Sequence, residues 1–183
     1  MQKTYLFLAN GFEEIEAISV VDVLRRGGVD VKTVSISTEK QVVGSHEIEI
    51  TADLTLDEIT TEEAECLIFP GGMPGSKHLG DCVVLMELLQ KQYDKGGYIG
   101  AICAAPALVL GQLKLKSKLR LTCYPNLETY FSANFELSED GLVVDGHVIT
   151  AKGASYAITF ALCLLEQLKS AEESKKVAEG MLL

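Results

Sequence analysis

The sequence lacks several features that mark common protein classes. It holds 16 lysines and arginines against 26 acidic residues, and its formal net charge of −10 disfavours binding to nucleic acid or to an anionic membrane. No apolar run approaches the roughly 20 residues of a transmembrane helix, and the amino end shows neither a basic stretch nor a cleavage site of a secretion signal. We therefore expect small molecules as partners and a cytoplasmic location.

Paired cysteines are also missing. The five cysteines are odd in number and widely spaced, and no two form a Cys-x-x-Cys pair, so neither a disulfide framework nor a zinc site is predicted. The three histidines, His46, His78 and His147, fall in turn or hairpin contexts, where each is expected to be a surface residue rather than a ligand or a base. We expect no metal and no cofactor, and five reduced thiols: Cys66, Cys82, Cys103, Cys123 and Cys163.

What the sequence does contain is a regular alternation of strand and helix signals. Short apolar runs end at turn residues, and stretches with apolar residues at helical spacing follow them. This order predicts an α/β fold with a mostly parallel, doubly wound sheet, helices on both faces and an antiparallel addition near the carboxyl end. With 48% hydrophobic residues in 183 and no internal repeat, we expect a single domain over residues 1–183.

The boundaries of the predicted elements follow from these patterns. Strands are expected at residues 4–9, 31–37, 66–70, 119–123 and 136–151, with another ending at Cys103 and a hairpin over residues 42–51. Helices are expected at residues 13–26, 54–64, 83–95, 155–168 and 172–183, with Ser155 as the N-cap of the fourth. Ligands of such folds lie beyond the carboxyl ends of the strands, so residues 10–16, residues 71–75 and Cys103 should lie at one edge.

Cys103 stands where an apolar run is predicted to turn into a helix that contains Pro106. The free N–H groups and the positive dipole end of that helix would favour the thiolate, so this position is typical of a nucleophile. Free cysteines are more often small buried apolar residues that do not react. This stretch alone leaves both interpretations open.

Glu16 and the glycine-rich loop carry a similar ambiguity. A carboxyl group held over the edge of the sheet near the start of a helix would have a raised pKa and remain a proton donor. By spacing alone, Glu16 is better read as a solvated first-turn acid that complements the helix dipole, as Glu13 and Glu14 are. The N–H groups of residues 71–75 could stabilise an oxyanion, or the glycines could serve only the geometry of the turn.

Three segments together carry a resemblance to a known family. They read Gly-Phe-Glu-Glu-Ile-Glu-Ala, Phe-Pro-Gly-Gly-Met-Pro-Gly and Ala-Ile-Cys-Ala-Ala-Pro, and with their surroundings from about Lys3 to Leu168 they resemble the ThiJ/PfpI superfamily, in the branch of the Parkinson-disease protein deglycase and its bacterial counterparts. The resemblance implies a flavodoxin-like sandwich in one ThiJ/PfpI domain, of the class I glutamine-amidotransferase-like type. It also implies a homodimer formed through the helix at residues 13–26, whose apolar residues lie on more than one face.

The resemblance also implies roles for individual residues. Cys103 would be a reactive nucleophile-elbow cysteine in strained backbone geometry, and Glu16 would be protonated and hydrogen-bonded to its thiol. The amides of Gly72 and Ala104 would line an anion pocket, and we place Gly71 and Tyr124 at the substrate site with them. Activities attributed to such proteins are cofactor-free conversion of methylglyoxal to a hydroxy acid, repair of glycated amines or thiols, redox-regulated chaperoning and, in another branch, proteolysis.

The sequence departs from the family pattern at Ala104 and at Tyr124. The protease-like branch has a histidine directly after the cysteine, whereas this chain has Ala104, so no Cys-His pair is available there. Many relatives in the present branch have a histidine at the position of Tyr124, and a phenol with a pKa of about 10 is a poor proton carrier near neutral pH. This second departure argues against fast isomerisation of aldehydes.

Three functions are compatible with these observations. The first is a cysteine-dependent enzyme of the glyoxalase or deglycase type that acts on reactive aldehydes or glycated groups in stress defence. The second is a redox-sensing cysteine protein or chaperone without turnover, in which Cys103 is oxidised to a sulfinate. The third is an enzyme of the thiamin pathway, for which the sequence offers no phosphate loop.

Overall fold

A computed structural model of the chain describes residues 3–59 and 64–183. Its centre is a sheet with the strand order β10-β11-β7-β6-β1-β2-β5. Every neighbouring pair in this sheet is parallel except β10 with β11. The strands are β1 Lys3–Leu8, β2 Val31–Ser35, β5 Leu54–Thr55, β6 Ala64–Phe69, β7 Tyr98–Ile102, β10 Leu142–Asp145 and β11 Val148–Ala151.

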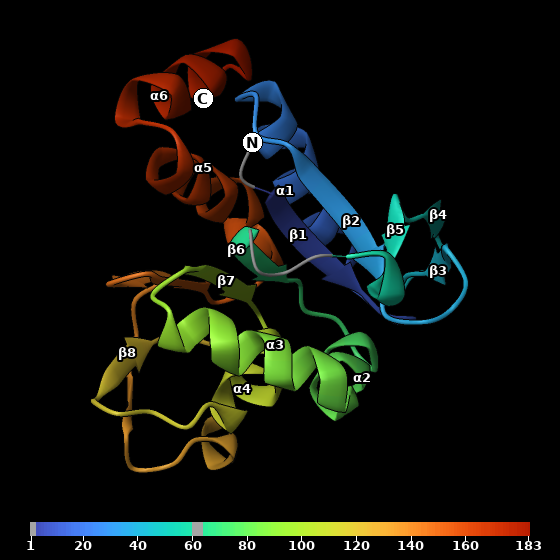
Figure 1. The fold of residues 1–183 in the computed structure, drawn as a ribbon. Helices are drawn as coiled ribbons and strands as arrows, with labels where there is room; N and C mark the ends of the chain where they lie inside the picture. Colours follow the sequence, from blue (N-terminus) through green and yellow to red (C-terminus); the bar gives the residue numbers. More distant parts are fainter. Residues whose placement is uncertain (1–2, 60–63) are drawn as a thin grey trace.

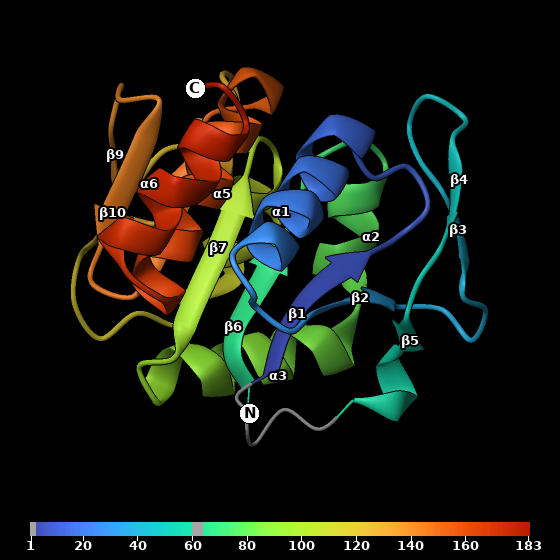
Figure 2. The ribbon, with the colours of Figure 1, turned by 90° about the horizontal axis from the view of Figure 1, so that it is seen from above.

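Helices cover both faces of the sheet, as Figures 1 and 2 show. One face carries α1 Glu14–Arg26, α5 Ala157–Leu168 and α6 Ala171–Gly180, and the other carries α2 Gly75–Asp81, α3 Val83–Asp94 and α4 Ala105–Leu108. Alternate residues of a strand enter different cores: Leu6 and Leu8 pack toward α1 and α5, whereas Tyr5 and Phe7 pack on the opposite face. Burial on both faces explains why β1 is a continuous apolar run. The predicted flavodoxin-like α/β fold is confirmed.

Smaller elements surround the sheet. β3 Gln41–Val43 and β4 Glu49–Thr51 form the predicted hairpin, and β8 Leu119–Leu121 pairs in parallel with β9 Phe135–Leu137. The pairing of β10 with β11 is the predicted antiparallel addition. Single 3-10 turns are found at Leu56–Glu58, Leu110–Gln112, Glu128–Tyr130 and Ala154–Tyr156.

The helix predicted at residues 54–64 is wrong over its described part. Leu54 and Thr55 instead form β5 at the edge of the sheet beside β2, and the 3-10 turn Leu56–Glu58 follows. Thr55 and Glu58 close this turn through a reciprocal capping box, with the Thr55 N–H donating to the Glu58 carboxylate at 2.8 Å. Residues 60–63 of the prediction lie outside the described residues.

Two further helix predictions need correction. Ser155 is not an N-cap, because it lies inside a 3-10 turn that continues into α5, and Tyr156 takes the N-cap position without a side-chain hydrogen bond. α2 was not predicted, because residues 75–81 contain two glycines and a single large apolar residue, Leu79, and so show no helical repeat. No helix of the described residues has both the length and the apolar character needed to cross a membrane.

Candidate active site

Cys103 lies at the junction between β7 and α4, as predicted. Its φ is +64°, in the left-handed region that residues other than glycine rarely adopt. Two backbone hydrogen bonds hold it there: the Cys103 N–H donates to the Ala151 carbonyl at 2.9 Å, and the Tyr124 N–H donates to the Cys103 carbonyl at 2.7 Å. Strained geometry at the elbow is therefore confirmed. The predicted helix dipole contributes little, because α4 holds only 4 residues.

Glu16 occupies the first turn of α1 and is fully buried, at 0% exposure. Its Oε2 accepts a hydrogen bond from the Gly71 N–H at 2.7 Å, whereas the buried Oε1 meets no hydrogen-bond donor. An ionised oxygen without a donor is costly inside a protein, so this arrangement favours a proton on Oε1. The interpretation of Glu16 as a solvated first-turn acid is wrong.

Gly71 fits between the acid and the thiol. A Cβ atom at this position would lie 2.5 Å from Glu16 Oε2 and 3.0 Å from Cys103 Sγ, so a larger residue cannot occupy it without displacing one of them. Its N–H bonds to Glu16, and Gly71 thus positions the acid rather than binding an oxyanion. Residues 10–16, residues 71–75 and Cys103, which were expected at one edge of the sheet, do meet there.

Two other amides face the sulfur. The N–H groups of Gly72 and Ala104 lie near enough to the Cys103 thiol to lower its pKa. Gly72 has a φ of +91°, and a Cβ there would overlap the backbone of residues 11–13, so only glycine brings its N–H to this point. These two donors form a small anion-stabilising pocket around Sγ.

Glu16 and Cys103 influence each other's titration because the carboxyl and the thiol both lie against Gly71. Burial raises the pKa of Glu16 to about 7, and the Gly71 and Cys103 hydrogen bonds only partly offset that rise. Burial, followed by the charge of an ionised Glu16, raises the pKa of the Cys103 thiol to about 12, although the Gly72 and Ala104 amides lower it. The expected lowering of the thiol pKa is thus wrong, because burial and the neighbouring Glu16 outweigh the two amides.

Tyr124 contacts the elbow through its backbone. Its side chain is 53% exposed and lies beside Gly153, where a Cβ would be 3.7 Å from the ring. The phenol is therefore at the solvent side of the site. His46 and His78 are exposed as predicted, and His147, in the turn between β10 and β11, is partly exposed with its ring 5.2 Å from that of Tyr93.

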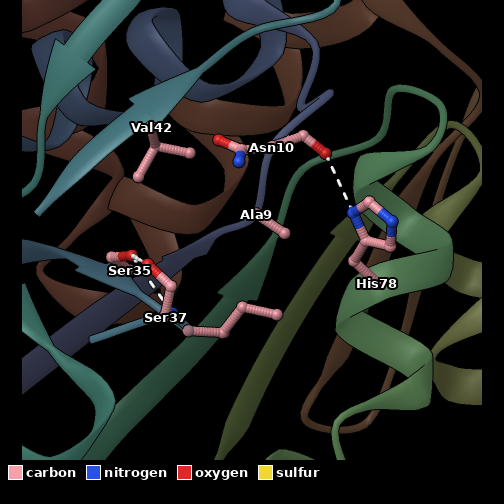
Figure 3. A pocket seen from close by; sticks show the side chains of 7 residues that line it. Ala9, Asn10, Ser35, Ser37, Val42 and His78 are labelled. Carbon is pink, nitrogen blue, oxygen red and sulfur yellow. Dashed lines mark hydrogen bonds between the residues drawn. The ribbon is translucent and has the colours of Figure 1, made fainter. Parts of the chain in front are cut away.

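A pocket that the sequence did not predict opens at the carboxyl ends of β1 and β2 (Figure 3). Its volume is about 290 Å³, and Asn10, which lines it, directly precedes the residues 11–13 that contact Gly72. The His78 imidazole closes one side, with its Nδ1 3.1 Å from the Asn10 carbonyl oxygen. The lining residues are Ala9, Asn10, Ser35, Ile36, Ser37, Val42 and His78. The only sequence signal was the position of Asn10 directly after a predicted strand.

Comparisons with known proteins agree with this geometry. The chain is 36% identical over 183 residues to Protein DJ-1 homolog A of Arabidopsis thaliana, covering 99% of this chain but only 47% of that protein, so it spans about half the length of this relative. It is 35% identical over 172 residues to the glutathione-independent glyoxalase DJR-1.2 of Caenorhabditis elegans, covering 93% of this chain and 90% of that protein.

A solved structure supports the same assignment. Drosophila melanogaster DJ-1beta superposes with a TM-score of 0.93 at 34% identity, covering 100% of this chain and 98% of that one. The family model described as DJ-1/PfpI matches residues 2–167, a range that includes the elbow, the buried acid and the glycine loop. The family-model match and these similarities show that the chain belongs to the DJ-1/PfpI family.

Proposed function

We propose that this protein is a cofactor-free, cysteine-dependent enzyme that acts on reactive aldehydes or glycated groups. The observation that carries the proposal is the pair of Cys103 and Glu16, in which burial raises the pKa of the acid to about 7. A group with a pKa near the working pH both accepts and returns protons efficiently. The relative named as a glutathione-independent glyoxalase supports the same reaction class.

Methylglyoxal illustrates the proposed chemistry. The Cys103 proton passes to ionised Glu16, and the thiolate adds to the aldehyde carbon to form a hemithioacetal. The N–H groups of Gly72 and Ala104, which lower the pKa of the Cys103 thiol, are placed to stabilise negative charge that develops beside the sulfur. Glu16 returns its proton to the new alkoxide and then moves a proton from the former aldehyde carbon to the adjacent carbon, while the hydroxyl proton passes to the neighbouring oxygen, which yields a thioester of lactic acid. Water hydrolyses this thioester, so that one methylglyoxal and one water give one lactate and the free thiol.

The test is lactate formation from methylglyoxal by the purified protein. We expect turnover in the wild type and none in Cys103→Ala, which lacks the nucleophile. Glu16→Gln keeps the shape of the side chain but cannot accept and return a proton, so it should lose at least about a hundredfold in kcat. Equal lactate formation by wild type and Cys103→Ala would refute the proposal.

A second candidate is a redox-sensing protein without turnover. The observation that favours it is the pair of amides around a partly exposed sulfur, because two N–H donors also suit the oxygens of a cysteine sulfinate. Under this alternative, dilute peroxide oxidises Cys103 before the other four cysteines, and methylglyoxal yields no lactate. Mass spectrometry of the peroxide-treated protein together with the lactate assay distinguishes the two functions.

We also propose a two-fold dimer formed through α1. Ile15 and Ile18 on this helix are 58% and 44% exposed, whereas Val20, Val21 and Val23 are buried within the chain. Ile18 also lines a groove of about 250 Å³ together with Ile158 and Met181. Large apolar side chains gathered on one helix face are typical of an interface. A dimer there would bring the first turn of α1, and with it Glu16, close to the partner chain.

A further inference from the structure

Glu13, Glu14 and His46 form a cluster that the proposed aldehyde chemistry does not use. Their ligand atoms, one from each side chain, all lie within 4.8 Å of one another. His46 Nδ1 is 2.9 Å from Glu14 Oε2 and 3.7 Å from Glu13 Oε2. Ser45 Oγ lies 3.2 Å from an oxygen of each carboxylate. One nitrogen and three oxygens, from the start of α1 and from the turn between β3 and β4, therefore lie close together.

The backbone holds this arrangement in place. The turn between β3 and β4 is fastened to the start of α1, because the Ser45 N–H donates to the Phe12 carbonyl at 2.8 Å and the Gly11 N–H donates to the Val43 carbonyl at 2.7 Å. A Cβ atom at Gly44 would overlap the Glu14 carboxylate, so only glycine lets the turn approach the acid so closely. The fold thus fixes the turn and the Glu14 carboxylate beside each other, and the exposed His46 side chain reaches Glu14 from this turn.

The charge of the cluster is not balanced by lysine or arginine. Among the described residues, His46 is the only basic side chain that forms an ion pair with Glu13 or Glu14. Glu14 is 6% exposed, and its two carboxylate oxygens are held by hydrogen bonds from the His46 backbone N–H and from Ser45 Oγ. Two carboxylates therefore meet here without a lysine or arginine partner among the described residues, and the site attracts a cation.

We propose that Glu13, Glu14 and His46 bind a divalent transition-metal ion of the zinc class. His46 Nδ1, Glu14 Oε2 and Glu13 Oε2 supply one imidazole and two carboxylate ligands, which suit Zn²⁺ and leave a position for water. Ca²⁺ prefers six to eight oxygen ligands and Mg²⁺ an octahedron of oxygens, which the imidazole does not provide. The backbone N–H of His46 donates to Glu14 Oε1 at 2.7 Å and fixes the orientation of the ligating carboxylate. This site does not depend on the proposed enzymatic function.

The experiment is a calorimetric titration with Zn²⁺ at slightly alkaline pH, under reducing conditions, in a Cys103→Ser background. The substitution removes the reactive thiol, and the remaining cysteines contribute equally to every variant. We expect the parent to bind one more Zn²⁺ than His46→Ala, and Glu13→Gln to bind that ion at least about tenfold more weakly. His78→Ala, which removes another exposed histidine, is the matched control and should bind like the parent.

Cobalt absorption provides the second measurement. Co²⁺ bound by nitrogen and oxygen ligands shows weak visible bands, whereas Co²⁺ bound by thiolates shows strong charge-transfer absorption in the near ultraviolet. The visible bands should be present in the parent and absent in His46→Ala. Both His46→Ala and Glu13→Gln change partly or fully exposed side chains, so folding is expected to be retained. No binding by the parent, or the same stoichiometry and affinity in His46→Ala, would overturn the proposed site.

Discussion

Replacing Glu16 by glutamine should change how the stability of the protein depends on pH. The ordinary pKa of this carboxyl is 4.5, and burial raises it to about 7 in the folded chain. Between these two values the native state keeps a proton that the unfolded state releases. The stability from this source is therefore complete below pH 4.5 and is lost as pH rises through about 7.

The size of the effect follows from the shift. A difference of roughly 2.5 pKa units at about 1.4 kcal/mol each lowers the free energy of unfolding by about 3 kcal/mol between pH 4.5 and pH 8. Glutamine has nearly the same shape and can accept the Gly71 N–H hydrogen bond, but it does not titrate. The Glu16→Gln variant should therefore lack this fall, whatever constant offset the substitution adds to its stability.

The assay is urea unfolding followed by circular dichroism at several pH values, since the chain contains no tryptophan. Repeating the comparison in a Cys103→Ala background removes the titration of the thiol. Glu14 and His46 are unchanged in both proteins, so their contributions cancel in the difference. A difference in unfolding free energy between wild type and Glu16→Gln that stays constant across this pH range would show that Glu16 is not a buried acid with a raised pKa.

Three further predictions test the site and its assembly. Substoichiometric alkylation should label Cys103 before Cys82, because only Cys103 has an adjacent proton acceptor and two amide donors at its sulfur; predominant labelling of Cys82 by peptide mapping would contradict the assignment. Gly71→Ala should abolish aldehyde turnover and lower stability by about 1–3 kcal/mol, since its Cβ overlaps the acid and the elbow, whereas Gly180→Ala, in open space, should do neither. Ile18→Glu should convert the proposed dimer to a monomer in light scattering, and a wild type that is already monomeric at micromolar concentration would refute the dimer.

Much of the fold could be predicted because strands buried on both faces have a simple sequence pattern. β1 and β6 are short apolar runs that end at turn residues, and each was located to within about two residues. Residues 54–59 were misread because a strand of 2 residues and a 3-10 turn leave too few residues to show any period. The helix α2 was missed for the related reason that its packing depends on tertiary contacts rather than on an apolar repeat.

The residues of the candidate site could be predicted because they follow the ends of three neighbouring parallel strands. β7, β6 and β1 are adjacent in the sheet, so the segments that follow their carboxyl ends converge. Sequence alone could not show that Glu14 is buried, because the cover comes from the hairpin turn at Gly44, about 30 residues away. For the same reason, no local sequence pattern indicated that Glu13 and Glu14 lie beside His46.

The charge state of the site was the least predictable feature, because it depends on which of two adjacent groups holds a proton. From the sequence, N–H donors around Cys103 were expected to lower the thiol pKa, and those donors are present. Burial and the carboxylate of Glu16 act in the opposite direction, and neither the depth of burial nor the distance between the groups is written in local sequence. Reactivity at Cys103 therefore requires transfer of its proton to Glu16 rather than loss of that proton to water, which makes the acid as necessary to the chemistry as the nucleophile.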